Sequence, residues 1–476
     1  GVEVPDTATL AARREYNAAG ELVAEYAPPE NADVDPAPDD LAGRRLTTYR
    51  KTIDASGHTI HTTTGSDSST AVRESYSDGR LARVGGTGTY GKRYVHGVEP
   101  PEPGAYPRPF TQEIVLDENG ADTLEWTKTY TDLLGRESHT LSSSGALSVR
   151  GYDEVGQLVS EVDPDGVTQL YAYDSRGRRV ITAVDMDRDG EIDFDGEDQI
   201  SRTTMRYGQR DGADVVRTVT EVWIEEGDAI SVAEVSRYEA STDGRETWMT
   251  VDGLTTHSET IYGGAGNVTT TISYPDGTRR ESITLGGRLA SVAMIDSAGA
   301  QVSALGYGYD LLGRNDSVSD SRNGTTHLEY YVDDSLKAST TPDPDGSGPQ
   351  LPRRTVVTYD SRGRRDIITL PDLQTVDYDY FPTGELKSVT GARTYSAAYV
   401  YDHRGRLEEL SAGSCTTTWS YDPRSGYLQA KTYDDRLGTS YANTAAGRPE
   451  TRTLARGLRR RTQYDNAGQI EHIRYY

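Results

Sequence analysis

A run of acidic residues near the middle of the chain has the composition of a cation-binding loop. Residues 185–198 read Asp-Met-Asp-Arg-Asp-Gly-Glu-Ile-Asp-Phe-Asp-Gly-Glu-Asp, which is eight acids and one arginine. Carboxylates at the first, third and fifth positions, glycine at the sixth and isoleucine at the eighth reproduce the first half of a calcium-binding loop. Because Ca²⁺ prefers oxygen ligands, the chemistry that this segment predicts is Ca²⁺ coordination.

The expected ligands come from six positions of this loop, with the seventh loop position contributing its backbone carbonyl. They are Asp185, Asp187, Asp189, Glu191, Asp193 and Asp198, and Glu197 is an alternative for completing the shell. An EF-hand places a bidentate Glu at position 12, where this chain has Gly196. The flanking residues are strand-like, so we expect a calcium loop mounted on a hairpin. The alternative is a solvated acidic loop without an ion, although carboxylates crowded without a cation repel one another.

Motifs for catalysis are missing from the sequence. There is no Gly-x-Ser-x-Gly elbow, no His-Glu-x-x-His, and no glycine-rich phosphate loop followed by Lys and Ser or Thr. His58 and His61 would lie on opposite faces of an extended strand, which argues against a metal pair. Cys415 is the only cysteine, so no internal disulfide can form. The sequence predicts a protein that is not an enzyme; an enzyme within the less regular residues 205–300 is the alternative.

The elements that must position the acidic loop come from a repeated six-residue frame, Tyr-Asp-x-x-Gly-Arg. Each frame predicts a hairpin tip: Tyr ends a strand, Asp accepts bonds from backbone N–H groups of the turn, and Gly supplies a positive φ. The frame occurs fully or nearly so at Tyr152, Tyr173, Tyr309, Tyr359, Tyr401 and Tyr464. Near the C-terminus the tyrosines at 359, 380, 401, 421, 441 and 464 are 20–23 residues apart. A fixed period of this length indicates a repeat architecture.

Two further residue patterns accompany the frames. Tyrosines recur in pairs two residues apart, as at Tyr171 and Tyr173, and this predicts ladders of stacked tyrosines on one face of the sheet. The arginines of the frames are expected to cover tyrosine rings and to pair with the turn aspartates; an anion or glycan site is the alternative. These arginines are Arg136, Arg178, Arg314, Arg364, Arg406 and Arg448.

The amino-acid composition fits a sheet that is exposed to solvent on both faces. The chain has 476 residues, 34% of them hydrophobic, with 32 Tyr against 3 Phe and 4 Trp, and tyrosine keeps its hydroxyl hydrated while it buries its ring. The net charge of −25 argues against nucleic-acid binding. No run of 18 apolar residues occurs, so membrane insertion is not expected. The first residues lack the features of a signal peptide, and the chain starts and ends within the repeat pattern, which predicts a segment of a longer polypeptide.

These frames resemble those of the YD-repeat (Rhs-repeat) family, which includes bacterial polymorphic toxins, Tc-toxin shell components and teneurins. The resemblance implies a long β-ribbon wound spirally into a hollow cocoon, which in several members encloses a C-terminal toxin domain. Toxin-bearing members usually end the shell with an Asp-Pro-x-Gly-Leu segment. The Asp-Pro-Asp-Gly runs at 163–166 and 343–346 lack its Leu, so no catalytic residue is carried over.

We therefore expect an all-β, YD-repeat hairpin array that forms a spiral single-sheet shell with little helix. The whole chain, 1–476, would be one shell segment with a calcium-type loop at 185–198 and Pro/Asp-rich loops at 27–43, 98–111 and 341–353. The expected function is a noncatalytic shell that scaffolds or encloses a toxin or cargo domain of a large bacterial protein, outside the cell or on its surface. The alternative is an adhesive or polymer-forming extracellular protein, whose partners would be copies of itself.

Overall fold

The computed structural model describes residues 12–33, 43–226, 229–346, 348–434 and 437–476. In this part of the chain the elements are 38 β-strands and one short 3₁₀ turn, η1 (Gly264–Gly266).

The strands, in chain order, are β1 (Arg13–Tyr16), β2 (Leu22–Ala27), β3 (Arg45–Ile53), β4 (Thr59–Thr64), β5 (Thr70–Ser75), β6 (Leu81–Gly85), β7 (Lys92–Glu99), β8 (Arg108–Leu116), β9 (Asp122–Thr131), β10 (Glu137–Ser142), β11 (Leu147–Tyr152), β12 (Leu158–Val162), β13 (Thr168–Tyr173), β14 (Arg179–Asp185), β15 (Gln199–Arg210), β16 (Ala213–Glu226), β17 (Ala229–Ser241), β18 (Glu246–Val251), β19 (Leu254–Tyr262), β20 (Val268–Ser273), β21 (Arg279–Leu285), β22 (Arg288–Ile295), β23 (Gln301–Tyr309), β24 (Asn315–Asp320), β25 (Gly324–Tyr330), β26 (Leu336–Thr340), β27 (Arg354–Tyr359), β28 (Arg365–Thr369), β29 (Thr375–Tyr380), β30 (Leu386–Gly391), β31 (Ala397–Tyr401), β32 (Leu407–Ala412), β33 (Cys415–Tyr421), β34 (Leu428–Tyr433), β35 (Gly438–Asn443), β36 (Pro449–Thr453), β37 (Arg459–Tyr464) and β38 (Ile470–Tyr475).

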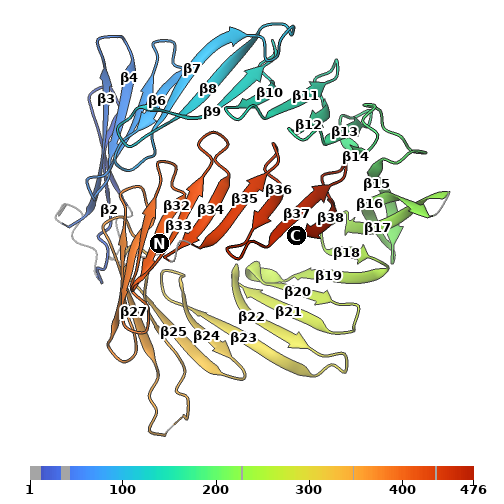
Figure 1. Cartoon of the computed structure of the whole chain (residues 1–476). Coiled ribbons are helices and arrows are strands. Elements are labelled where there is room, and N and C mark those ends of the chain that lie inside the picture. The colour runs from blue at the N-terminus through green and yellow to red at the C-terminus, as the bar shows by residue number, and fades with distance from the viewer. Residues whose placement is uncertain (1–11, 34–42, 227–228, 347, 435–436) are drawn as a thin grey trace.

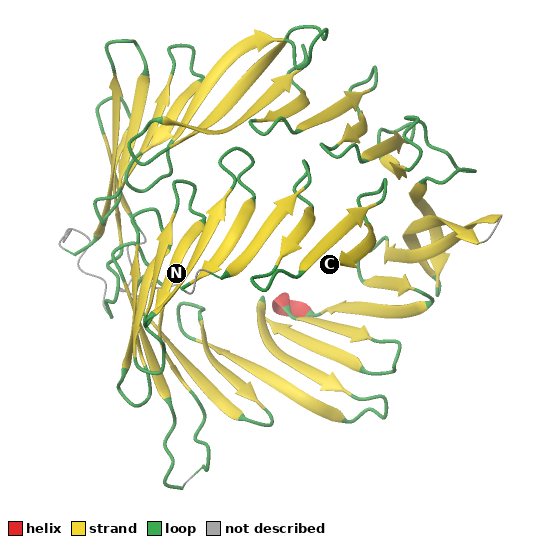
Figure 2. Cartoon of the chain, in the orientation of Figure 1, coloured by secondary structure: helices red, strands yellow, loops and turns green. Residues whose placement is uncertain are grey.

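All described strands belong to one antiparallel sheet in which each strand pairs with its neighbours in the chain. Figure 2 shows the result, a ribbon of successive hairpins with almost no helix. The sheet does not close into a barrel, because β1 and β38 do not pair with each other. These observations confirm the predicted all-β hairpin array.

The ribbon coils and returns on itself. In Figure 1 the strands run from β3 along the top to β12, down the right through β15–β18, and back along the bottom to β27. The last strands, β32–β38, then run beneath the first ones as a second turn. Side chains confirm this contact, because residues 270 to 328 positions apart in the sequence are hydrogen-bonded. The predicted spiral of a single sheet is therefore confirmed.

The frames form the hairpin tips as predicted. At one such tip, Asp174 Oδ1 accepts bonds from the backbone N–H groups of Arg176 and Arg178 at 2.9 and 3.0 Å. Gly177 has φ +78°, and the strand pairing shifts register next to Tyr173. This is a tight turn followed by a bulge, which adds twist to the ribbon.

The frame tyrosines join each hairpin to the one before it. The hydroxyl of Tyr173 donates to the backbone carbonyl of Leu158, which directly follows the preceding frame, at 2.7 Å. The same bond, at 2.7–2.9 Å, recurs at Tyr152, Tyr309, Tyr330, Tyr359, Tyr421 and Tyr464. Tyrosine is thus required here for its hydroxyl as well as for its ring.

The predicted ladders of stacked tyrosines are wrong. Among the described residues, Tyr331 and Tyr359 make the one tyrosine–tyrosine ring contact. Frame tyrosines stand on alternate strands, which places them about 9–10 Å apart, beyond the range of ring contacts at roughly 4.5–7 Å. The frame tyrosine rings contact arginine side chains instead. The guanidinium carbon of Arg136 lies 4.3 Å from the Tyr152 ring centroid, and Arg314, Arg364 and Arg406 repeat this contact at 4.5–5.0 Å.

The same arginines pair with the turn aspartates, four residues earlier in the chain. Two of the predicted arginines differ. Arg178 pairs with Asp174, but its guanidinium contacts Met205 and not a tyrosine. Arg448 pairs with Asp163 and Asp165, in a hairpin nearly 300 residues away.

The sheet is a single layer with little core. Its accessible surface is 28280 Å², against roughly 17,000 Å² for a compact monomer of this size. The main apolar cluster is small: Leu170, Ala183 and Ile200 are buried on β13, β14 and β15, and Ile192 and Trp223 are among the side chains that pack against them.

The three predicted loops fall between strands, with two differences in extent. Ala27, the first residue of the predicted loop 27–43, ends β2 and pairs with Arg45. The connection between β7 and β8 is shorter than the predicted 98–111, because Val98 and Glu99 pair with Pro109 and Arg108. The predicted loop 341–353 lies between β26 and β27, apart from residue 347, which is outside the described residues. Residues 34–42 of the predicted loop 27–43 are also outside them.

The tyrosine hydroxyls should contribute measurably to the stability of each hairpin. Replacing Tyr173 by Phe keeps the ring and removes one hydrogen bond, which should cost about 1 kcal/mol. Hydrogen exchange should then speed up in β12–β14 and stay unchanged in distant hairpins. The control is Tyr207→Phe, because Tyr207 is 83% exposed and its hydroxyl makes no hydrogen bond with the described residues. Equal effects of the two variants would contradict this role.

Candidate functional site

The acidic loop connects β14 to β15 and is anchored by its own apolar side chains. Ile192 packs against the Leu170–Ala183–Ile200 cluster, and the ring of Phe194 lies 5.3 Å from that of Trp223. The flanking elements are strands, as predicted, so the loop is mounted on a hairpin. This anchoring fixes the chain on which the carboxylates stand.

Five of the six predicted ligand residues gather in two overlapping groups. Carboxylate oxygens of Asp185, Asp187 and Asp198 lie within 4.8 Å of one another, and so do those of Asp187, Asp189 and Asp193. Asp187 belongs to both groups. The sixth residue, Glu191, is exposed and its side chain joins neither group, which agrees with its predicted role through the backbone carbonyl.

Two of these carboxylates are buried and held by the loop backbone. Asp185 and Asp198 are 1% and 6% exposed. Asp185 accepts from the N–H groups of Arg188 and Gly190, at 2.6 and 3.1 Å. Asp198 accepts from those of Met186 and Asp193, at 2.8 and 3.0 Å.

The loop carries an excess of negative charge that a cation would relieve. Burial, and then the charge of Asp198, raise the pKa of Asp185 above 3.8. Burial and the charges of Asp189 and Asp187 likewise raise the pKa of Asp193. The donor atoms are carboxylate oxygens, and two of the aspartates that supply them are held by the loop backbone. Such a set of donors fits a hard divalent cation such as Ca²⁺.

The acidic loop also lies where the two turns of the spiral meet. Asn466, in the last frame of the chain, donates to the backbone carbonyl of Met186 at 2.7 Å. Gln469 and Gln199 are joined by a 2.8 Å bond. A cation in the loop would therefore brace the contact between turns as well as the β14–β15 connection.

This contact, which we call the seam, runs along the facing rims of the two turns, between residues 31–199 and 359–469. The frame tips of the second turn meet the opposite tips of the first turn, in the same order along both. The partners include Asn31 with Tyr359, Asp67 with Arg362, Glu125 with Arg404, Ser143 with Arg424, and Asp165 with Thr444. These contacts are hydrogen bonds and ion pairs.

The two variable positions of the frame make many of these contacts. In the tip Asp402–Gly405, Arg404 holds a variable position and pairs with Glu125, which is 5% exposed. In the tip Thr444–Gly447, the N–H of Ala446 donates to Asp165 at 3.0 Å. At Arg404 the variable side chain itself makes the contact, whereas at Ala446 the backbone does.

Asp165 is a central acceptor of the seam. It takes bonds from Thr444 Oγ1 at 2.6 Å and from the backbone of Ala446, and it pairs with Arg448. Burial raises the pKa of Asp165, but these bonds outweigh that effect, and the pKa is lowered from 3.8. The carboxylate is therefore held in its charged form.

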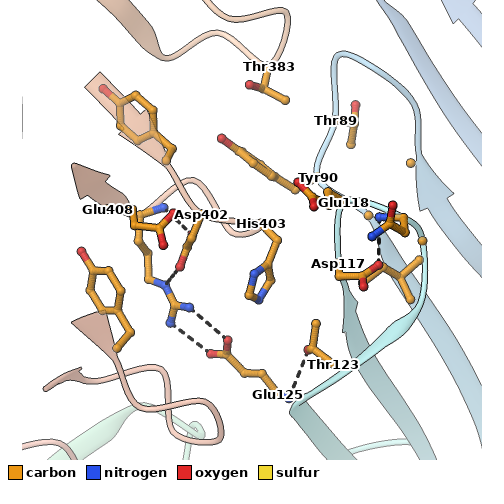
Figure 3. A pocket seen from close by; sticks show the side chains of 18 of the residues that line it. Thr89, Tyr90, Asp117, Glu118, Thr123, Glu125, Thr383, Asp402, His403 and Glu408 are labelled. Carbon is orange, nitrogen blue, oxygen red and sulfur yellow. Dashed lines mark hydrogen bonds and ion pairs between the residues drawn. The ribbon is translucent and has the colours of Figure 1, made fainter. Parts of the chain in front are cut away.

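A cleft of about 960 Å³ opens at the seam, between residues 83–125 and 383–423. Its walls carry the rings of Tyr90, Tyr401 and Trp419. Figure 3 shows Asp117 and Glu118 on one side, and Asp402, His403 and Glu408 on the other. Burial raises the pKa of Tyr90 to about 12, so its hydroxyl is protonated at neutral pH.

The cleft brings Ser420, His403 and Asp402 to one place without linking them. Asp402 is bonded to the guanidinium of Arg406 at 2.7 Å and to two backbone N–H groups of its own turn. No hydrogen bond joins His403 to a hydroxyl or carboxylate among the described residues. The described residues of the cleft therefore do not form the nucleophile–base–acid chain that acyl transfer requires.

Comparisons with known proteins agree with the frames. Residues 152–191 match the family model described as RHS Repeat, which confirms the resemblance to the YD-repeat family. A search of curated proteins finds no match. The described part of the chain contains no helix with the length and hydrophobicity of a membrane span.

Solved structures share the fold. "Crystal Structure of TcdB2-TccC3-Cdc42" and "Crystal Structure of TcdB2-TccC3 without hypervariable C-terminal region" each align with a TM-score of 0.58 and 16% identity. Each alignment covers 98% of this chain and 25% of the other. The chain thus has the fold of these structures and spans a quarter of their length.

Arg448 should hold the two turns together. Arg448→Ala removes its pairs with Asp163 and Asp165 and should weaken this part of the seam by about 1–3 kcal/mol. Hydrogen exchange at 163–166 and 444–448 should become faster. The matched control is Arg178→Ala, at the same frame position, because Arg178 pairs within its own tip. Unchanged exchange in Arg448→Ala would show that the seam does not depend on this ion pair.

Proposed function

We propose that this chain, with its RHS repeat and its toxin-shell fold, is a noncatalytic structural shell segment that encloses a partner domain of a large bacterial protein. The observation that carries the proposal is the seam. A ribbon whose second turn docks on its first forms a continuous curved wall, and a wall of this kind can surround another domain.

The alternative is an adhesive or polymer-forming protein built from the same repeats. A straight stack of hairpins would favour it, because such a stack extends without limit. The coiling of this ribbon and its docking onto itself favour the shell. The large solvent-accessible area of both faces of the sheet is also consistent with a wall that has solvent outside and cargo inside.

The partner in this proposal is a toxin or cargo domain of the same polypeptide, and the shell itself performs no reaction. The RHS Repeat match supports the noncatalytic role, because it indicates a structural repeat and not a catalytic family. The net charge of −25 supports protein cargo over nucleic acid, which would need a basic surface.

We also propose that the acidic loop binds Ca²⁺ through Asp185, Asp187, Asp189, Asp193 and Asp198, with the carbonyl of Glu191. Sites of this type in extracellular modules have dissociation constants of roughly 10⁻⁴–10⁻³ M. Such a site would be about half to nine-tenths occupied in millimolar calcium outside cells and largely empty in cytosol, which supports a secreted or surface location.

Enclosure predicts that a cargo domain resists protease while the seam is intact. In the polypeptide encoded by the complete gene, digestion should leave a domain outside residues 1–476 protected. Arg448→Glu places like charges together at the seam and should expose that domain, whereas Arg178→Glu, away from the seam, should not. Electron microscopy of the same samples checks the shape. A cargo domain cleaved at the same rate in all three proteins, or straight filaments, would favour the alternative.

Calcium binding predicts a local response to chelation. EGTA should bring proteolytic cleavage at about residues 180–200 and leave distant hairpins protected. Asp187→Asn, which touches both carboxylate groups, should be cleaved there even with millimolar calcium. Glu197→Gln removes the same charge from an exposed residue of the loop that joins neither group, so it should behave like the unmodified protein. Identical digestion with and without EGTA would identify a solvated acidic loop.

A further inference from the structure

The tip between β3 and β4 departs from the repeated frame in one informative way. Residues 54–58 read Asp-Ala-Ser-Gly-His, so His58 stands where most frames have arginine. Gly57 has φ +80° and Asp54 accepts from two backbone N–H groups, which shows that the turn is otherwise of the usual type. The substitution replaces a side chain that is always charged with one that is a metal ligand when neutral.

Two carboxylates converge on the His58 ring. Glu74, on β5, places Oε1 2.6 Å from His58 Nδ1. Asp54 places Oδ2 3.8 Å from the same nitrogen. Ligand atoms of the three residues all lie within 4.8 Å of one another. Two ligands of one zinc ion, each about 2.1 Å from it, are about 3.4 Å apart in tetrahedral geometry, and the two measured separations lie on either side of this value.

The surroundings hold these groups in place. Asp54 Oδ1 accepts from the N–H groups of Ser56 and His58, at 2.8 and 2.9 Å, which leaves Oδ2 directed at the ring. The ring of Tyr76 meets the His58 ring edge-on, with centroids 5.1 Å apart. Hydrogen bonds of the kind that Asp54 accepts orient metal ligands in known sites. The three side chains are each between 24% and 33% exposed, so an ion and its water ligands have access.

We propose that Asp54, His58 and Glu74 form a binding site for a divalent transition-metal ion of the zinc type. One imidazole nitrogen and two carboxylate oxygens are ligands that Zn²⁺ and Co²⁺ accept, and water completes the shell. The ion replaces the arginine of an ordinary frame: it neutralises the turn aspartate and ties the β3–β4 hairpin to β5. The site is separate from the acidic loop, whose donors are oxygens alone.

The spacing of the histidines in the sequence did not predict this site. His61 is exposed and does not belong to this group among the described residues. The additional ligands are Asp54, from the turn that precedes His58, and Glu74, from β5. Glu74 lies beside His58 because of the register in which β5 pairs with β4.

The test is calorimetric titration of the whole chain with ZnCl₂, in buffer with 1 mM CaCl₂ to occupy the acidic loop, together with Co²⁺ absorption spectra. The unmodified protein should bind one equivalent of Zn²⁺ and give the visible bands of a nitrogen–oxygen Co²⁺ site. Glu74→Gln should weaken binding by at least about 10-fold. His58→Arg restores the usual frame residue, so it should fold normally and lose the site. His61→Ala is the control and should bind like the unmodified protein.

Circular dichroism and melting curves without metal establish that each variant is folded. The site is supported if His58→Arg no longer binds Zn²⁺, if Glu74→Gln binds it at least about 10-fold more weakly, and if His61→Ala binds it like the unmodified protein. No binding by the unmodified protein, or equal binding by His58→Arg, overturns it. Because the experiment involves neither cargo nor the seam, its outcome is independent of the proposed shell function.

Discussion

The hydrogen bonds that the backbone N–H groups of a hairpin tip donate to its turn aspartate are the interaction on which the ribbon depends. They fix a tight turn, the glycine that follows supplies the left-handed conformation, and the resulting bulge sets the register of the two strands. The other oxygen of the same carboxylate positions the frame arginine, as Asp402 does for Arg406. That arginine then covers a tyrosine of the next hairpin, Tyr421. One carboxylate thus connects local turn geometry to the packing of successive hairpins, and a single-layer sheet is stable with few large apolar side chains.

Local features of this kind could be read from the sequence because they involve residues within one period. The frames predicted the tips, the strand ends and the all-β architecture, and the spacing of acids in 185–198 predicted carboxylates that the structure brings together. The spiral followed from the family resemblance, since the period alone does not determine curvature.

Features that depend on strand register or on distant parts of the chain could not be predicted in the same way. The prediction of a tyrosine ladder was wrong because tyrosines on alternate strands are too far apart for their rings to touch. The tyrosine rings contact arginine side chains instead. Arg448 looked like any other frame arginine, yet its partners are Asp163 and Asp165 in the other turn. Glu74 acquires its significance only because β5 pairs with β4 and so lies beside His58.

The ordered docking of tips along the seam restricts how such a chain can change during evolution. A hairpin gained within residues 31–199 would shift every later tip of the first turn against its partner in 359–469, unless the second turn gained one as well. Asp165 would then face the wrong tip. Residues 205–300 lie between the two docked arcs, so insertions there enlarge the circumference without disturbing the pairing. The long strands β15–β17, of 12 to 14 residues, occur in this permissive arc, where we expect related shells to differ most in length.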